Sequence, residues 1–149
     1  MPVDFTYKNF YDDTDNGMPT KYWGSSAAGC LFISKDSGRI LFAHRSSEVD
    51  FPNTWAGWGG KIDNEETPLQ AIEREVEEET GFSGNYKVNY LWTYRDPNSE
   101  FEYHNYIVVV PHEFTPKLNW ENNKSKWVEY GEWPSPLHFG VELLFKNAG

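Results

Sequence analysis

Apolar positions gather in short runs that turn-forming residues separate. Residues 27–34 form such a run, residues 35–38 (Lys-Asp-Ser-Gly) read as a turn, and residues 39–44 form a second run. Two short apolar runs joined by a polar turn that contains glycine are typical of a β-hairpin. The pattern therefore predicts an antiparallel strand pair early in the chain.

Further strands are expected in the second half of the chain. Residues 86–95 and 101–110 are rich in β-branched and aromatic residues, and the run Tyr-Ile-Val-Val-Val at 106–110 is the strongest β pattern present. A short strand is predicted at 127–130 (Trp-Val-Glu-Tyr). Residues 46–66 contain a proline and several glycines and predict a long shaped loop, which in compact domains is usually functional.

The clearest helix is predicted at residues 67–80. Thr67 suits the N-cap, Pro68 suits the first helical position, and Gln70 suits the reciprocal partner of a capping box. Gly81 follows, where a left-handed residue commonly ends a helix.

The same helix should bury an apolar stripe. Leu69, Ile72 and Val76 are spaced three and four residues apart, so they lie on one side of a helix. A closing helix is predicted at residues 135–146. Strands before and after a helix predict an α/β fold in which helices pack on a mixed sheet.

The chain of 149 residues has the usual size of one domain. We expect residues 1–24 to be an irregular lead-in and residues 25–149 to be the domain. Cys30 is the single cysteine, so we expect a reducing compartment and a buried, unreactive thiol. The sequence contains no run of roughly 18 apolar residues, the length needed to span a bilayer. It also shows no signal peptide pattern. A cytoplasmic protein without a membrane partner is expected.

The net charge of the chain narrows the class of molecule that it is expected to bind. The formal net charge is −10, whereas binding of a nucleic acid polymer needs clustered lysines and arginines. A protein this acidic would also repel a small anionic substrate unless metal cations intervened.

Acidic residues are concentrated in the predicted helix, at 73–79 (Glu-Arg-Glu-Val-Glu-Glu-Glu). At about 100° per residue, Glu75, Glu78 and Glu79 share one arc beside the apolar stripe. Like charges at this spacing repel by roughly a few tenths of a kcal/mol per pair, and the helix dipole disfavours anions in the last turns.

A solvated acidic face explains Glu73 and Glu77, which fall on the other side of the stripe. A bound cation explains the other three glutamates better, because hard divalent ions such as Mg²⁺ bind carboxylate oxygens and are often shared with substrate phosphates. Such a cation would also allow an acidic protein to hold an anionic substrate.

The wider spacing resembles the Nudix box, G-x5-E-x7-R-E-U-x-E-E-x-G-U, in which U is a bulky apolar residue. Every fixed position is matched in one register. The matching residues are Gly60, Glu66, Arg74, Glu75, Val76, Glu78, Glu79, Gly81 and Phe82. This resemblance to the Nudix hydrolases implies an α/β/α sandwich with a mixed sheet, in which the box forms a loop, a helix and a loop.

The resemblance also implies a metal site. Glu75, Glu78 and Glu79 would hold Mg²⁺, or Mn²⁺, with the main-chain carbonyl of Gly59 as a further ligand. Arg74 would orient these carboxylates.

Arg74 would act through Glu75 or Glu66, which suits a planar guanidinium group. Glu66 would then brace the loop rather than contact metal.

The implied reaction is cleavage of a phosphoanhydride bond. The metal would neutralise the diphosphate and lower the pKa of a water molecule, and a carboxylate would accept its proton. Glu75 or Glu79 could do so from within the box. Glu121, which precedes Trp127 as an acidic residue does in the family, is a candidate from a later loop, and Glu113 is the alternative.

Two basic residues are candidates for substrate phosphate. Arg45 ends the second predicted strand, and Lys61 follows the paired glycines at a position that is commonly basic in the family. His104 and His138 are expected to be packing residues.

Residues 54–60 (Thr-Trp-Ala-Gly-Trp-Gly-Gly) and Lys61 look like the W-x-G-x-G-G-K loop of some oxidised-purine nucleotide hydrolases. This similarity favours a (d)NTP or an oxidised (d)NTP as substrate. Several aromatic residues could stack on a base, although most are expected in the core. They are Trp58, Tyr94, Phe101, Tyr103 and Trp120.

Several alternatives stay open. The substrate could be ADP-ribose, a dinucleotide or a nucleotide sugar, or the domain could sense nucleotides without cleaving them, which usually accompanies loss of box glutamates. Isomerase chemistry on an isoprenoid diphosphate would need further catalytic residues. RNA decapping conflicts with the net charge, and a homodimer is possible.

Overall fold

The structure is a computed structural model that describes residues 26–63 and 65–148. The lead-in predicted at residues 1–24 lies outside the described residues.

β1 (Ser26–Ser34) runs through the middle of a seven-stranded mixed sheet. β6 (Glu102–Val110) pairs with β1 in parallel along its length, and β5 (Lys87–Arg95) pairs with β6 in antiparallel orientation. The other edge of β1 is shared, because its first half pairs with β4 (Trp58–Lys61) and its end pairs with β2 (Ile40–Arg45). The mixed sheet and the β1–β2 hairpin confirm the prediction.

β2 pairs with the two remaining strands. It pairs with β3 (Trp55–Ala56) and with β7 (Asn122–Val128), both antiparallel. The sheet therefore forks at this edge of β1, with β4 beside the first half of the strand and β2 beside its end.

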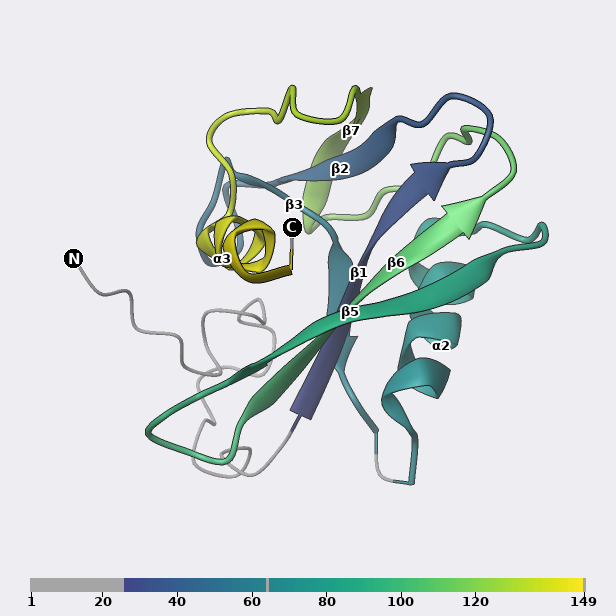
Figure 1. The fold of residues 1–149 in the computed structure, drawn as a ribbon. Helices are drawn as coiled ribbons and strands as arrows, with labels where there is room; N and C mark the ends of the chain where they lie inside the picture. The colour runs from purple at the N-terminus through teal and green to yellow at the C-terminus, as the bar shows by residue number, and fades with distance from the viewer. Residues whose placement is uncertain (1–25, 64, 149) are drawn as a thin grey trace.

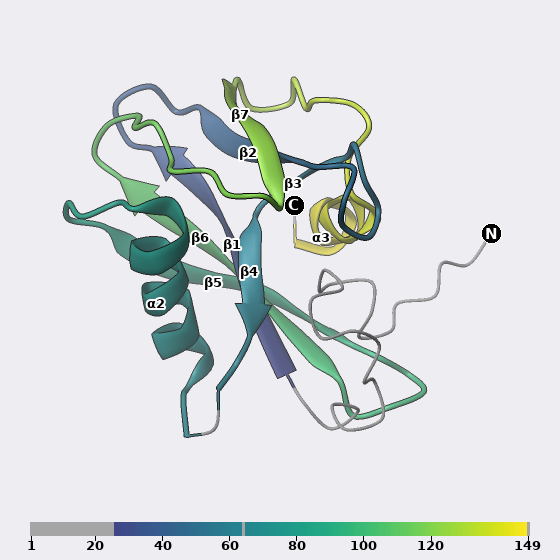
Figure 2. The same ribbon diagram turned by 180° about the vertical axis from the view of Figure 1, so that it is seen from behind.

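The helices α2 (Pro68–Thr80) and α3 (Phe139–Ala148) lie on opposite faces of the sheet, as Figures 1 and 2 show. α2 packs on β1 and β4, and α3 lies near β5. This arrangement is the predicted α/β/α sandwich in a single domain. Neither helix within the described residues is long and apolar enough to cross a membrane.

α2 begins and ends where its sequence predicts. The Thr67 side chain accepts a hydrogen bond from the Gln70 amide and the Gln70 side chain accepts one from the Thr67 amide, at 3.1 and 2.9 Å. Gly81 takes the left-handed conformation, with φ at 74°. The helix is therefore capped at its N-terminus by its own side chains and ends at a left-handed glycine.

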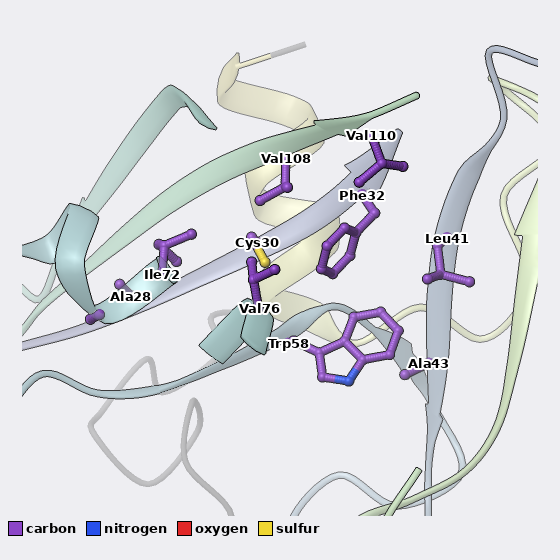
Figure 3. Close-up of a cluster of buried hydrophobic side chains, with 11 residues drawn as sticks. Ala28, Cys30, Phe32, Leu41, Ala43, Trp58, Ile72, Val76, Val108 and Val110 are labelled. Atoms are coloured by element: carbon purple, nitrogen blue, oxygen red, sulfur yellow. The ribbon is translucent and has the colours of Figure 1, made fainter. Parts of the chain in front are cut away.

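The core between α2 and the sheet gathers the buried faces of β1, β2 and β6 (Figure 3). Cys30 belongs to it and is buried, as predicted, and burial raises the pKa of its thiol. The largest rings are those of Phe32 and Trp58, which meet edge to face at 5.5 Å.

The prediction of one continuous loop at residues 46–66 was wrong, because β3 and β4 lie within it. The glycines that suggested a loop instead allow β4 to pair closely with β1. Such close backbone approach is the other use of glycine in a strand.

Two element boundaries also differ from the prediction. β7 begins at Asn122, because its polar residues lie on a half-exposed strand that pairs with β2. α3 begins only at Phe139 rather than at residue 135. The backbone before Phe139 forms hydrogen bonds with β3 instead of a helical turn. The Trp55 amide donates to the Pro136 carbonyl, and the His138 amide donates to the Trp55 carbonyl, both at 2.9 Å.

The apolar stripe of α2 is displaced from the predicted one. Ile72 and Val76 are buried as expected, but Leu69 is 45% exposed and Glu75 is buried in its place. Gly60 explains the difference, because an added Cβ there would lie 2.9 Å from Glu75 Oε2. The missing side chain of Gly60 leaves room for the Glu75 carboxylate against the sheet.

Candidate functional site

A pocket of about 290 Å³ lies where β1, β4 and β6 face the end of α2 and one side of α3. It collects residues that the sequence analysis had placed far apart in the chain. The predicted site residues in its lining are Arg45, Gly59, Lys61, Glu75, Glu79 and Glu121. Arg74 and Glu78 are not part of the lining.

Close packing of β4 on β1 shapes one wall of the pocket. Gly57 lies against the Cys30 carbonyl, and a Cβ added to Gly59 would meet the Ala28 carbonyl and the Tyr103 hydroxyl, both at 2.6 Å. Any side chain at these positions would push β4 away from β1. The glycines therefore leave a wall of bare backbone that exposes main-chain groups to the pocket.

Glu75 is the most strongly perturbed carboxylate of the site. It is only 6% exposed, and its pKa is raised to about 7, first by burial and then by the nearby charge of Glu79. Arg74 opposes this shift, with its Nη1 3.4 Å from Glu75 Oε2. Arg74 is the one cationic partner of Glu75 among the described residues, and a buried anion in this environment would be stabilised by a bound cation.

Arg74 holds the loop between β4 and α2. Its Nε and Nη2 donate to the two oxygens of Glu66 at 2.9 and 3.0 Å, and Nη2 also donates to the Lys61 carbonyl at 3.1 Å. The Arg74 hydrogen bonds lower the pKa of Glu66. Glu66 in turn accepts from the Asp63 amide at 2.9 Å. Arg74 thus contacts both of the carboxylates considered from the sequence, and Glu66 braces the loop.

Glu79 and Glu121 reach the pocket from different elements and share a neighbour. Asn119 Nδ2 donates to Glu79 Oε1 at 3.3 Å, and Asn119 Oδ1 accepts from the Glu121 amide at 2.9 Å. The Glu121 carbonyl accepts from the Ser46 amide at 2.8 Å. Within the part of the chain that the structure describes, the Glu121 carboxylate has no hydrogen-bond or ion-pair partner.

The donor atoms fit a hard cation that keeps part of its water shell. Among residues 26–63 and 65–148, no three acidic, histidine or cysteine side chains converge into a metal cage. Mg²⁺ does not require one, because it usually takes one or two carboxylates and fills its other positions with water and substrate phosphates. Glu75, Glu79 and the bare backbone at Gly59 offer such oxygens in one pocket, while Glu78 is exposed on the solvent side of α2.

Arg45 and Lys61 bring positive charge to the same pocket. Arg45 ends β2, and its Nε and Nη2 donate to the Asp50 carbonyl at 2.8 and 2.5 Å. This contact holds the guanidinium group at the end of the strand. Both residues are therefore in place to contact an anionic substrate.

Sequence reasoning missed part of the lining. Tyr103 was considered only among several aromatic residues, His138 was expected to serve packing alone, and Asn105 and Asn122 were not considered. These residues are not part of a sequence motif with a recognisable spacing. The alternation of β6 places Tyr103 and Asn105 on one face of the strand, but only the fold shows which face lines a pocket.

The other residues considered from the sequence lie elsewhere. Glu113 is outside the pocket lining and its Oε2 accepts from Arg39 Nε at 2.6 Å. His104 is half-buried and bonds Thr93 at 2.9 Å, as expected for a packing residue. Of the remaining aromatic candidates, Tyr94 and Phe101 are buried in the core and Trp120 is 52% exposed.

Comparison with known proteins identifies one protein family. The sequence model of the NUDIX domain matches residues 25–144. The chain is 44% identical over 55 residues to an 8-oxo-dGTP diphosphatase of Haemophilus influenzae, covering 37% of this chain and 39% of that protein. It is 37% identical over 51 residues to an RNA pyrophosphohydrolase of Halorhodospira halophila, covering 34% and 26%. The matched segment thus spans well under half the length of each of these relatives.

Solved structures agree on the fold. The crystal structure of a Nudix hydrolase from M. smegmatis superimposes with a TM-score of 0.64 at 21% identity, covering 83% of this chain and 81% of that one. At this identity the likeness concerns the fold alone.

Proposed function

Because the chain belongs to the NUDIX domain family, we propose that its pocket hydrolyses a phosphoanhydride bond in a nucleoside diphosphate derivative. The observation that carries the proposal is the meeting of Glu75 and Glu79 with Arg45 and Lys61 in one pocket. Carboxylates for a cation and basic groups for phosphate are the parts that phosphoryl chemistry needs, since its catalysis is mostly positioning and charge stabilisation.

Mg²⁺ is the proposed cofactor, with Mn²⁺ as the alternative. Glu75, Glu79 and the Gly59 carbonyl would hold it from the pocket, and Glu78 would contribute from the exposed side of α2. When bound, the cation supplies charge neutralisation for the diphosphate and acidifies a water molecule. The raised pKa of Glu75, caused by burial and by Glu79, supports this ligand set, because a cation would offset both effects.

The reaction transfers a phosphoryl group to water. A water oxygen forms a bond to one phosphorus of the anhydride, the bridging P–O bond breaks, and its electron pair leaves with the departing phosphate. Glu121 accepts the proton of the attacking water in this proposal. Support comes from its place in the pocket and from the absence of any partner for its carboxylate within the described residues.

Arg45 and Lys61 would bind the substrate phosphates, and Arg74 would act on the reaction only through Glu75 and the loop. The Asp50 carbonyl already fixes the Arg45 guanidinium group, so less side-chain freedom is lost when a phosphate binds.

A nucleoside triphosphate or an oxidised (d)NTP is the leading substrate class. The relative described as an 8-oxo-dGTP diphosphatase supports it. An RNA 5′ end is the second candidate, favoured by the relative described as an RNA pyrophosphohydrolase and disfavoured by the net charge of −10. We further propose a cytoplasmic location and no membrane partner; a homodimer stays a prediction.

The test is product formation over a panel of canonical and oxidised (d)NTPs, ADP-ribose, NADH, diadenosine polyphosphates, nucleotide sugars and a 5′-triphosphate RNA, with Mg²⁺ and with EDTA. Metal-dependent cleavage of at least one compound is expected, and the compound cleaved fastest identifies the substrate class. A folded protein that binds a nucleotide but cleaves none would instead be a nucleotide sensor.

A further inference from the structure

The pocket is chemically divided. Its charged lining residues come from β2, β4, α2 and the loop before β7: Arg45, Lys61, Glu75, Glu79 and Glu121. The wall formed by β6 and α3 carries no carboxylate, lysine or arginine, and its side chains include the buried Val141 and Leu144. If the charged part takes metal and phosphates, the uncharged part is left for the rest of the substrate.

Asn105 is the carboxamide side chain that β6 contributes to this uncharged wall, beside Tyr103 and Tyr106. It is half-buried, and the only hydrogen bond of its side chain within the described residues is a long one, from Nδ2 to the Tyr103 carbonyl at 3.4 Å. A carboxamide has two N–H donors and an oxygen acceptor. One donor and the oxygen of Asn105 are therefore available to a ligand, in a place where an unpaired polar group costs free energy.

The space beside Asn105 suits a flat group. Gly29 pairs with Asn105 across β1 and β6 and contributes no side chain. The Tyr103 hydroxyl lies against Gly29 and Gly59, and Val141 and Leu144 face the sheet from α3. An aromatic ring placed here would lie between these apolar side chains and the Tyr103 side chain, which covers Gly29.

We propose that Asn105 is a specificity-determining residue that hydrogen-bonds the edge of the nucleobase of a mononucleotide substrate. The inference rests on the proposed function and adds the substrate class to it. At about 290 Å³ the pocket is close to the lower end of the roughly 300–1,000 Å³ that small-molecule sites span. It is sized for one nucleoside rather than the two of a dinucleotide.

Asn105 would distinguish bases because their edges differ in the order of donors and acceptors. A carboxamide offers one of each side by side and matches only an edge that presents the complementary pair. A base with two acceptors or two donors at that place leaves one group unpaired, which is the strongest basis for rejecting a ligand.

The test measures binding, so it does not depend on turnover. Non-hydrolysable α,β-methylene analogues of dATP, dGTP, dCTP, dTTP and 8-oxo-dGTP are titrated by calorimetry into the wild type in the presence of Mg²⁺. The variants are Asn105→Leu, which removes both hydrogen-bonding groups, and Asn105→Asp, which keeps the size and only the acceptor. Asn122→Leu is the matched control, because Asn122 lines the pocket beside Arg45 and Glu121.

We expect Asn105→Leu to weaken binding of the preferred analogue by about 5- to 150-fold, the range for one lost pair of base contacts, and to bring the affinities of all bases together. Asn105→Asp should shift the preference toward bases that present donors. Asn122→Leu should weaken all analogues to the same extent and leave their order unchanged.

The inference is overturned if the ratios among the bases change by less than about twofold in both folded Asn105 variants. It is also overturned if diadenosine polyphosphates bind the wild type more tightly than the mononucleotides do. In either case metal-dependent hydrolysis by the wild type would leave the proposed function standing. A wild type that neither binds nor cleaves any compound would remove both.

Discussion

Glu75 is a carboxylate held in the interior of the protein, between Arg74 and the backbone of Gly60. Its spacing within the box could be read from the sequence, but its burial could not. Burial depends on the missing side chain of Gly60, fifteen positions earlier in the sequence. The apolar spacing of the helix alone predicted that Leu69, rather than Glu75, would be buried against the sheet.

The first prediction concerns the pH dependence of stability in EDTA. The pKa of Glu75 is raised from 4.5 to about 7 in the folded protein, so the folded state binds this proton more tightly than the unfolded state does. The stabilising contribution of that proton is fully present below pH 4.5 and is lost as pH rises through about 7. The loss is at most roughly 3 kcal/mol, at 1.36 kcal/mol per pKa unit.

Glu75→Gln should therefore be more stable than the wild type at pH 8 and similar to it near pH 4.5, in urea unfolding without metal. Glu73→Gln is the control, since Glu73 is exposed on the same helix, and it should follow the wild type. Equal stability of wild type and Glu75→Gln at pH 8 would show that Glu75 is not buried as an anion.

The second prediction separates two glycines that both touch Tyr103. A Cβ at Gly29 meets only the Tyr103 side chain among its nearest atoms, whereas a Cβ at Gly59 also meets the Ala28 carbonyl at 2.6 Å. Each substitution by alanine should cost about 1–3 kcal/mol through overpacking. In a Tyr103→Leu background the cost of Gly29→Ala should largely disappear, while the cost of Gly59→Ala should remain.

Urea unfolding of the three single and two double variants measures these costs. If Tyr103→Leu restored the stability of Gly59→Ala as fully as that of Gly29→Ala, the close approach of β4 to the β1 backbone would not be the reason for a glycine at position 59.

At the scale of elements, β4, the loop after it and α2 behave as one unit held by Arg74. The helix could be predicted closely, because Thr67, Gln70 and Gly81 encode its ends locally. β3 and β4 could not, because two-residue and four-residue strands depend on the partners that the sheet provides. The same holds for β7, whose polar residues form a strand only beside β2.

The third prediction tests this unit with Arg74→Lys. Lysine keeps the charge but cannot make the paired contacts to Glu66 or reach the Lys61 carbonyl at the same time. Hydrogen exchange in residues 61–66 should become faster, and activity should fall about 10- to 100-fold, as for other residues that support a metal site. Arg39→Lys is the control, because Arg39 makes a similar pair with Glu113 outside the pocket. Unchanged exchange in residues 61–66 would contradict this role.

At the scale of the whole molecule, the divided sheet brings the site together. β1 gives one edge to β6 and shares the other between β4 and β2, so residues between Gly29 and Leu144 meet in one pocket. The sequence indicated the fold class and the acidic half of the site, because the box is contiguous. The uncharged half, with Asn105 and Val141, depends on how β6 and α3 are placed in three dimensions, and no local pattern encodes that placement.

The net charge of −10 also belongs to this scale. An anionic substrate approaches a protein of like charge, and among the described residues that line the pocket Arg45 and Lys61 oppose the repulsion. A divalent cation at Glu75 and Glu79 would add positive charge at that point. We therefore expect the acidic face of α2 to work with a metal.

The most direct test compares Mg²⁺-dependent hydrolysis of the best nucleotide substrate by the wild type, Glu79→Gln and Glu73→Gln. The two variants make the same chemical change on one helix, but only Glu79 lines the pocket. Glu79→Gln should lose at least about 100-fold in kcat, as when other essential electrostatic groups are removed, while Glu73→Gln stays close to the wild type. Equal effects of the two substitutions, or full activity of the wild type in EDTA, would contradict a role of the acidic face of α2 in binding a metal that hydrolysis needs.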